Sequence, residues 1–288
     1  MIKINLDEKI KKLKKKYNLP NIENKFVDKQ QYEQYQVDSY NASKGNLDSF
    51  DGYNCTLCKN KGDLMYISNG YQYSKQCKCM EVRKTISNMK RSGLKDIIRD
   101  YTLDKYEERE YWQKNIKTKA IKYIEDSKPN WWYINGISGS GKTHICTAIC
   151  REYLLKGEVV KYMLWKQEST VLKACINDYE IYEKKMNQLK HAEILYIDDF
   201  LKPIKDKEGH ISPPTTADIN LAFELIDFRK NANLRTVISS ERNILELLEI
   251  DNATTGRIIE KATKEYIINI GRDASRDQRL KGILETVI

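Results

Sequence analysis

The stretch NGISGSGKTH, residues Asn135 to His144, contains the pattern Gly136-x-x-x-x-Gly141-Lys142-Thr143. An apolar, strand-like segment, WWYIN, precedes it, and HICTAICREYLL, which has helical spacing, follows it. A strand, a glycine-rich loop and a helix in this order are typical of a phosphate-binding loop. The sequence therefore predicts that this chain binds a nucleoside triphosphate.

Each residue type in the loop has a physical role. Glycines let successive backbone N–H groups point at the phosphates, and the positive end of the following helix adds to the attraction. Lys142 is expected to reach the β- and γ-phosphates, and the Thr143 hydroxyl to ligate Mg²⁺. The expected nucleotide-binding residues of the loop are Gly136, Ser138, Gly139, Ser140, Gly141, Lys142, Thr143 and His144.

A second segment, ILYIDDF, ends an apolar run with two carboxylates, Asp198 and Asp199. Open α/β sheets place their ligand chemistry at the carboxyl ends of strands. Asp198 is the expected partner of the nucleotide's Mg²⁺, and Asp199 is then placed to orient the attacking water as a general base. A small-molecule kinase has no need of the second acid, so the pair favours an ATPase; a polar strand end that caps a turn is the alternative.

Helical and strand-like segments alternate beyond the loop. Strand-like runs cover 159–165, 193–198, 235–240 and 266–270, and a helix is predicted over 217–230. Such alternation predicts an α/β fold with a mostly parallel sheet covered by helices on both faces.

Composition limits the possible classes of protein. The 288 residues are 40% hydrophobic and 32% charged, with no apolar run long enough for a membrane span, which needs about 18 residues. The first residues lack the apolar segment of a signal peptide, so a cytoplasmic protein with no membrane partner is expected. The net charge of +9 favours an acidic partner such as nucleic acid.

Four of the seven cysteines lie close together in the sequence, as Cys55-x2-Cys58 and Cys77-x-Cys79. This set offers four thiolates for a tetrahedral Zn²⁺, and the segment between the pairs is expected to form a β-hairpin that turns at Asn69-Gly70. Some thirty residues bury too little surface to fold alone, so the metal would supply the stability. A redox dithiol is the rival interpretation, but it needs one pair within a thioredoxin-like unit.

Residues 1 to about 18 are predicted to form a basic amphipathic helix, with an apolar stripe of Leu6, Ile10, Leu13 and Tyr17. This helix either docks a partner or packs on its own domain. The polar stretch from 21 to 51 is expected to be irregular or to form short helices.

Over residues 50 to 285 the chain resembles helicase loaders of bacteria and phages of the DnaC/DnaI type. The segments that carry the resemblance, in order, are the CxxC…CxC module, GISGSGKTH, ILYIDDF, TADINLAFELIDFRKN, RTVISSERNILELLEID and GRIIE. The resemblance implies an AAA+ ATPase fold. It also implies that the amino-terminal domain binds a hexameric replicative helicase, which the protein helps to place on single-stranded DNA as replication, in this case of a phage, begins. The predicted domains are then a helicase-binding segment over 1–50, a zinc module with a basic helix over 51–93, and an ATPase domain over 94–288.

Site residues follow from the same resemblance. Lys142 and Thr143 match the Walker A residues, and Asp198 and Asp199 the Walker B acids. The resemblance also implies two catalytic arginines. Arg257, in TTGRIIE, matches the arginine finger, which reaches the γ-phosphate bound by a neighbouring subunit and so implies self-association. Arg279, in DQRLK, matches the sensor II arginine.

The sensor I position has no assignment, because the strand ends in Ser239-Ser240-Glu241 and an acid cannot donate to a phosphate. Two other functions stay open. One is a transposition-type AAA+ DNA ATPase. The other is an adaptor, held together by zinc, that uses ATP as a switch with little turnover.

Overall fold

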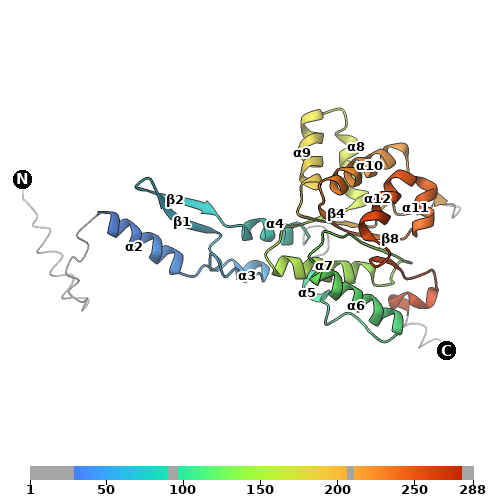
Figure 1. Ribbon diagram of the computed structural model, residues 1–288, viewed down its shortest axis with the longest axis horizontal. Helices are drawn as coiled ribbons and strands as arrows, with labels where there is room; N and C mark the ends of the chain where they lie inside the picture. The colour runs from blue at the N-terminus through green and yellow to red at the C-terminus, as the bar shows by residue number, and fades with distance from the viewer. Residues whose placement is uncertain (1–28, 90–96, 206–210, 281–288) are drawn as a thin grey trace, which may run out of the picture. The chain divides into compact units, whose positions relative to one another are not determined.

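The computed structural model describes residues 29–89, 97–205 and 211–280 (Figure 1). The chain divides into two compact units, Met1–Cys77 and Lys78–Ile288. The first groups the polar segment that follows residue 28 with most of the cysteine segment. The predicted helix over 1–18 lies outside the described residues, and the functional division into 1–50, 51–93 and 94–288 stays a prediction.

The first unit is built on an antiparallel hairpin of β1 (Asp63–Ser68) and β2 (Tyr71–Gln76). Asn69 and Gly70 both have left-handed backbone angles, with φ of 50° and 76°, as a two-residue hairpin turn of this type requires. The hairpin predicted between the cysteine pairs is therefore confirmed. A short helix, α3 (Asp48–Asp51), precedes the first pair.

Helix α2 (Lys29–Ala42) packs on β1 in a stretch where irregular structure or short helices were expected. Its sequence has little helical periodicity, and several of its contacts are made by polar side chains. Asn41 donates to the Met65 carbonyl oxygen at 2.8 Å and accepts from the Met65 N–H at 3.1 Å. Val37 is its buried apolar residue. A helix held by amide hydrogen bonds gives only a weak apolar pattern in the sequence.

The second unit contains a five-stranded sheet in the order β4-β5-β8-β3-β9. All neighbouring pairs are parallel, so the predicted α/β fold with a parallel sheet is confirmed. The strands are β3 (Trp132–Asn135), β4 (Val160–Leu164), β5 (Ile194–Asp198), β8 (Arg235–Ser240) and β9 (Ile267–Asn269).

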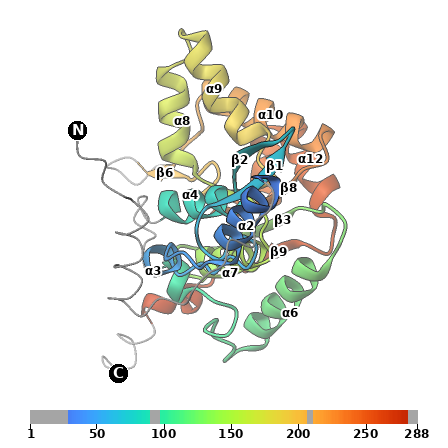
Figure 2. The same cartoon turned by 90° about the vertical axis from the view of Figure 1, so that its left-hand side faces the viewer.

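Helices cover both faces of this sheet (Figure 1). Those of the unit are α4 (Cys79–Met89), α5 (Ile97–Asp100), α6 (Tyr111–Glu125), α7 (Lys142–Leu155), α8 (Trp165–Ala174), α9 (Tyr179–Lys190), α10 (Thr216–Asn231), α11 (Ile244–Ile250) and α12 (Asn252–Ala262). The described part of the unit also contains a small hairpin of β6 (Ile204–Lys205) and β7 (Ile211–Ser212) and a 3₁₀ turn, η2 (Ala274–Arg276). Helices α8 and α9 stand together beside α10 (Figure 2). None of the helices in the described ranges has the length and apolar character of a membrane span.

The two faces of the sheet have different cores. Every residue of β3 is buried, because a parallel sheet is covered on both sides. Tyr133 faces the core formed with α10 and α12, whereas its neighbour Trp132 points to the opposite face and contacts Tyr123 of α6. Since the strands are parallel, β3, β5 and β8 all end at one edge of the sheet. The phosphate loop follows β3 at this edge, and the acid pair lies at the end of β5.

Candidate nucleotide site

The loop between β3 and α7 has the backbone that its glycines predict. Gly139 and Gly141 lie in the left-handed region, with φ of 79° and 85°. A Cβ atom on Gly139 would lie 1.8 Å from Asp277 Oδ1, so a side chain at this position has no space. The loop therefore needs glycine both for its curvature and for its close contact with the segment after β9.

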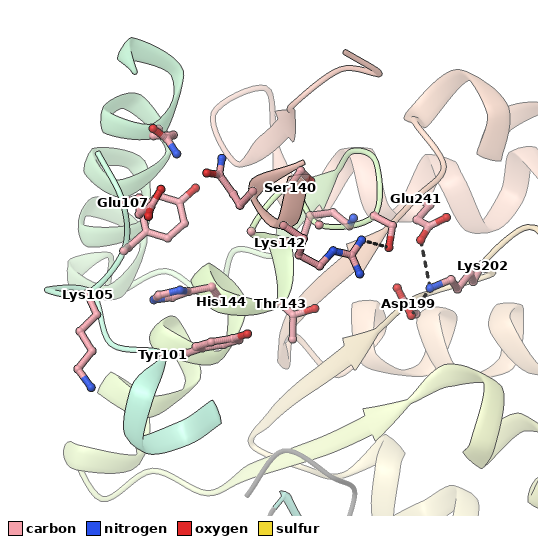
Figure 3. Close-up of a pocket in the computed structure, with 17 residues that line it drawn as sticks. Tyr101, Lys105, Glu107, Ser140, Lys142, Thr143, His144, Asp199, Lys202 and Glu241 are labelled. Carbon is pink, nitrogen blue, oxygen red and sulfur yellow. Dashed lines mark hydrogen bonds and ion pairs between the residues drawn. The ribbon is translucent and has the colours of Figure 1, made fainter. Parts of the chain in front are cut away.

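A pocket of about 430 Å³ opens beside this loop (Figure 3), within the size range of ligand sites. Loop residues Ser138 to His144 form one wall. The expected residues that line it are Ser138, Gly139, Ser140, Gly141, Lys142, Thr143, His144, Asp199 and Arg279. Several other residues that line the pocket were not assigned to a nucleotide site from the sequence, namely Tyr101, Lys105, Tyr106, Glu107, Gln113, Lys202, Glu241 and Gln278.

Lys142 is held at the bottom of the loop and is only 5% exposed. Its ammonium donates to the carbonyl oxygens of Gly136 and Ile137, at 2.9 and 2.7 Å. Burial lowers the pKa of Lys142, and the carboxylates of Glu241 and Asp199 act in the opposite direction. A cation in this position suits an anionic ligand above the loop.

The Thr143 hydroxyl lies 3.4 Å from Asp198 Oδ1, so the loop and the acid pair meet. Asp198 also accepts hydrogen bonds from Ser239 Oγ and, at 3.2 Å, from the Tyr162 hydroxyl. Burial raises the pKa of this carboxyl group. A hydroxyl and a carboxylate side by side are hard oxygen ligands of the kind that Mg²⁺ prefers, so the residues present fit this ion.

Asp199 belongs to a second, adjacent group of charges. Its backbone is left-handed, with φ of 55°, and its N–H donates to Ser239 Oγ at 3.1 Å. The Lys202 ammonium lies 2.8 Å from Asp199 Oδ2 and 3.1 Å from Glu241 Oε1 (Figure 3). Burial acts to lower the pKa of Lys202, but the hydrogen bonds to the two carboxylates raise it overall. This lysine is thus a fully charged bridge between the ends of β5 and β8.

His144 packs against two tyrosines that also line the pocket. Its ring stacks on Tyr101, with 4.4 Å between centroids and planes within 4° of parallel, and meets Tyr106 edge-on at 5.3 Å. Its Nε2 lies 2.9 Å from the Thr102 carbonyl oxygen. Burial lowers the pKa of His144, which favours the neutral ring. The tyrosines come from a segment with no recognisable motif, which is why the sequence did not reveal them.

The two arginines predicted to act in catalysis lie in different places. Arg279 donates to Ser138 Oγ at 2.9 Å, next to the backbone bond from Gln278 N–H to the Gly139 carbonyl oxygen. Arg257 is absent from the residues that line the pocket and lies on α12. Its guanidinium pairs with Asp227 at 2.5 Å. The structure therefore brings Arg279, but not Arg257, to the pocket of its own chain.

Four buried sulfur atoms lie together in the cysteine segment. Those of Cys55, Cys58, Cys77 and Cys79 all lie within 4.8 Å of one another, and Cys55 and Cys77 are 3.8 Å apart. Sulfurs that surround one zinc tetrahedrally are separated by about 3.8 Å. The Gly62 N–H points at Cys58 Sγ at 3.3 Å, as it would toward a thiolate. These residues fit Zn²⁺, which would hold the two ends of the hairpin segment together.

The sheet order, with the phosphate loop after β3 and the acid pair at the end of β5, defines an α/β P-loop nucleotide-binding fold. No protein-family model matches the chain. Phage-like element PBSX protein XkdC of Bacillus subtilis (strain 168) is 28% identical over 248 residues, which cover 80% of this chain and 88% of that protein.

Replicative helicase loader DnaC of Escherichia coli (strain K12) is 23% identical over 176 residues, 60% of this chain and 67% of that one. A crystal structure of the DnaC helicase loader superposes with a TM-score of 0.50 at 17% identity, covering 60% of this chain and 98% of that one. The resemblance to helicase loaders of the DnaC type is confirmed, and the chain shares its α/β fold with that structure.

Proposed function

We propose that this chain is an ATPase that loads a hexameric replicative helicase onto single-stranded DNA when replication begins. The observation that carries the proposal is the contact of Thr143 with Asp198 beside a phosphate loop, which joins a nucleotide site to a metal-binding carboxylate. Similarity to a protein named as a replicative helicase loader supports the helicase as partner. Similarity to a phage-like element protein over 80% of the chain supports a phage setting.

The proposed reaction is the hydrolysis of ATP. Backbone N–H groups of the loop and the Lys142 ammonium bind the phosphates, and Asp199 takes the proton of the attacking water. The water oxygen bonds to the γ-phosphorus, the bond from this phosphorus to the β,γ-bridging oxygen breaks, and ADP and phosphate result. Mg²⁺, bound through Thr143 and Asp198, would neutralise charge on the β- and γ-phosphate oxygens.

Two arginines complete the proposed site. Arg279 is close enough to the loop, through Ser138, to respond to the phosphate state of its own subunit. Arg257 would act on the nucleotide of a neighbouring subunit, in exchange for its ion pair with Asp227. Because a finger of this kind neutralises charge on the transferring phosphoryl group, turnover would require self-association.

The amino-terminal unit is the proposed helicase-binding part. Zinc at the four cysteines would make the hairpin and α2 a rigid surface. The apolar stripe of Leu6 and Leu13 would dock a groove on the helicase. DNA would bind the ATPase domain, which agrees with the net charge of +9, and its affinity would fall steeply with salt.

One observation favours a second function, that of a nucleotide-dependent adaptor with little turnover. The carboxylate proposed as general base, Asp199, is already paired with Lys202. If this ion pair persisted with ATP bound, the base would stay occupied, and the chain would change its binding state without hydrolysis.

Affinity capture combined with ATP turnover tests the proposal. The full chain is used as bait for the replicative helicase, and a Leu6→Asp/Leu13→Asp variant is the matched control. Helicase capture that the variant loses, together with turnover stimulated by single-stranded DNA, supports the loader. Capture without turnover supports the adaptor, and capture of a transposase in place of the helicase supports a transposition-type ATPase.

A further inference from the structure

An unusual concentration of acids lies where the triphosphate would end. Asp198, Asp199 and Glu241 are all at the carboxyl ends of β5 and β8, and the last two line the pocket. A carboxylate facing a phosphate costs free energy unless a cation lies between them. Glu241 has its cation in Lys202, at 3.1 Å.

The turn that carries Lys202 is strained and firmly fixed. Asp199 and Leu201 both have left-handed φ angles, 55° and 46°, which are unfavourable for residues other than glycine. The Phe200 N–H donates to the Ser239 carbonyl oxygen at 2.8 Å, and Arg242 Nε donates to the Leu201 carbonyl oxygen at 2.7 Å. A strained turn persists only where its surroundings hold it, and such turns are concentrated at functional sites.

The position of Lys202 allows it to change partners. Its ammonium is bound by two carboxylates that both line the pocket, and Lys202 lines the pocket as well (Figure 3). Its side chain is about one-third exposed, at 38%, so its head group can turn without opening the core. A terminal phosphate carries more negative charge than one carboxylate and would compete for this ammonium.

We propose that the Lys202 ammonium binds the terminal phosphate of ATP while it stays paired with Glu241. When Lys202 leaves Asp199 for this phosphate, the Asp199 carboxylate becomes free to act as the general base. This inference rests on the proposed ATPase function. It also gives Glu241 a role. This acid cannot donate to a phosphate, but its carboxylate holds the lysine that does. It also explains why Asp199 can be paired in the structure and still act in hydrolysis.

The test compares affinities for a non-hydrolysable ATP analogue and for ADP, measured by calorimetry. In Lys202→Met the affinity for the ATP analogue should fall roughly ten- to a hundred-fold, the usual worth of a charged hydrogen bond. The affinity for ADP should change by less than about three-fold, because ADP lacks the phosphate that Lys202 contacts. Lys184→Met, which removes an exposed lysine on α9, is the control for charge and should leave both affinities unchanged.

A Lys202→Met/Glu241→Gln double variant distinguishes two possible roles of Lys202: direct contact with the terminal phosphate, and neutralisation of the Glu241 carboxylate. If Lys202 contacts the phosphate, the double variant remains unable to prefer the ATP analogue. Recovery of the preference shown by the unsubstituted protein would overturn the inference, because Lys202 would then only neutralise Glu241. Failure of the unsubstituted protein to bind either nucleotide would overturn the proposed function as well, whereas binding with no change in Lys202→Met would overturn the inference alone.

Discussion

Thr143 Oγ1 lies 3.4 Å from Asp198 Oδ1, although the two residues are 55 positions apart in the chain. Thr143 is the second residue of α7, after the phosphate loop, and Asp198 ends β5; β8 lies between β5 and β3 in the sheet. Their contact depends on parallel strands that end at one edge. It places the two proposed Mg²⁺ ligands next to the loop, and Asp199 follows directly.

Replacing Asp199 with Asn should leave ATP binding close to normal and reduce turnover. The amide cannot accept a proton from water, and general bases contribute roughly 10²- to 10⁴-fold to rates. Nucleotide affinity by calorimetry and steady-state phosphate release measure the two effects separately. If affinity and turnover fall together, the roles assigned to Asp198 and Asp199 are wrong.

Arg257→Ala should bind ATP normally and hydrolyse it about 10³-fold more slowly or worse, as expected for loss of an arginine finger. Asp227→Asn is the matched control, because it breaks the same ion pair and keeps the guanidinium. If Arg257 has only a structural role, the two variants should lose ATP turnover to the same extent.

Mixing Arg257→Ala with Asp199→Asn extends this test. Each variant supplies what the other lacks, so mixed assemblies should regain part of the activity. No recovery, with mixed assemblies verified by crosslinking, would place the action of Arg257 within its own subunit or outside catalysis.

The parts of the fold and site with strong local patterns could be predicted from sequence. Apolar runs indicated the strands of the sheet, and the spacing of Gly136 to Thr143 indicated the loop. Lys202 was not assigned to this site from the sequence, since its position depends on a tertiary contact between the turn after β5 and the end of β8. Glu241 was the sequence feature that could have indicated such a lysine, because an acid that faces a phosphate site requires a cation nearby. Helix α2 could not be predicted as one long helix, because its sequence has no apolar stripe.

The purified protein should contain about one zinc per chain. Removing zinc by chelation should unfold the cysteine hairpin, since the metal joins its ends, and leave ADP affinity unchanged. Cys58→Ser should reproduce this loss, whereas Cys175→Ser, outside the cluster, should retain zinc. Elemental analysis and limited proteolysis provide the readouts. A metal-free protein with a protease-resistant hairpin would contradict the zinc site.

His144 should make the ATPase unit less stable in mild acid. Burial lowers its pKa below the ordinary value of about 6.5, so the unfolded chain takes up a proton at a higher pH than the folded one. The stability contributed by the neutral ring is present above this ordinary value and is lost as pH falls through it. His144→Gln keeps a donor for the Thr102 carbonyl oxygen and should show a smaller fall in Tm between about pH 7.5 and about pH 5.5. An equal fall in both proteins would contradict the buried, neutral ring.

The most direct test of the central claim is helicase loading on circular single-stranded DNA coated with single-strand-binding protein. The proposed loader function predicts that the replicative helicase is stably deposited only when this chain and ATP are both present. It also predicts that Lys142→Ala, which removes the phosphate-binding ammonium, abolishes deposition together with ATP binding, while Lys184→Ala on the exposed face of α9 supports both. Helicase deposition that is equally efficient without the chain, or with Lys142→Ala in its place, would contradict the proposal that this protein is an ATP-dependent loader.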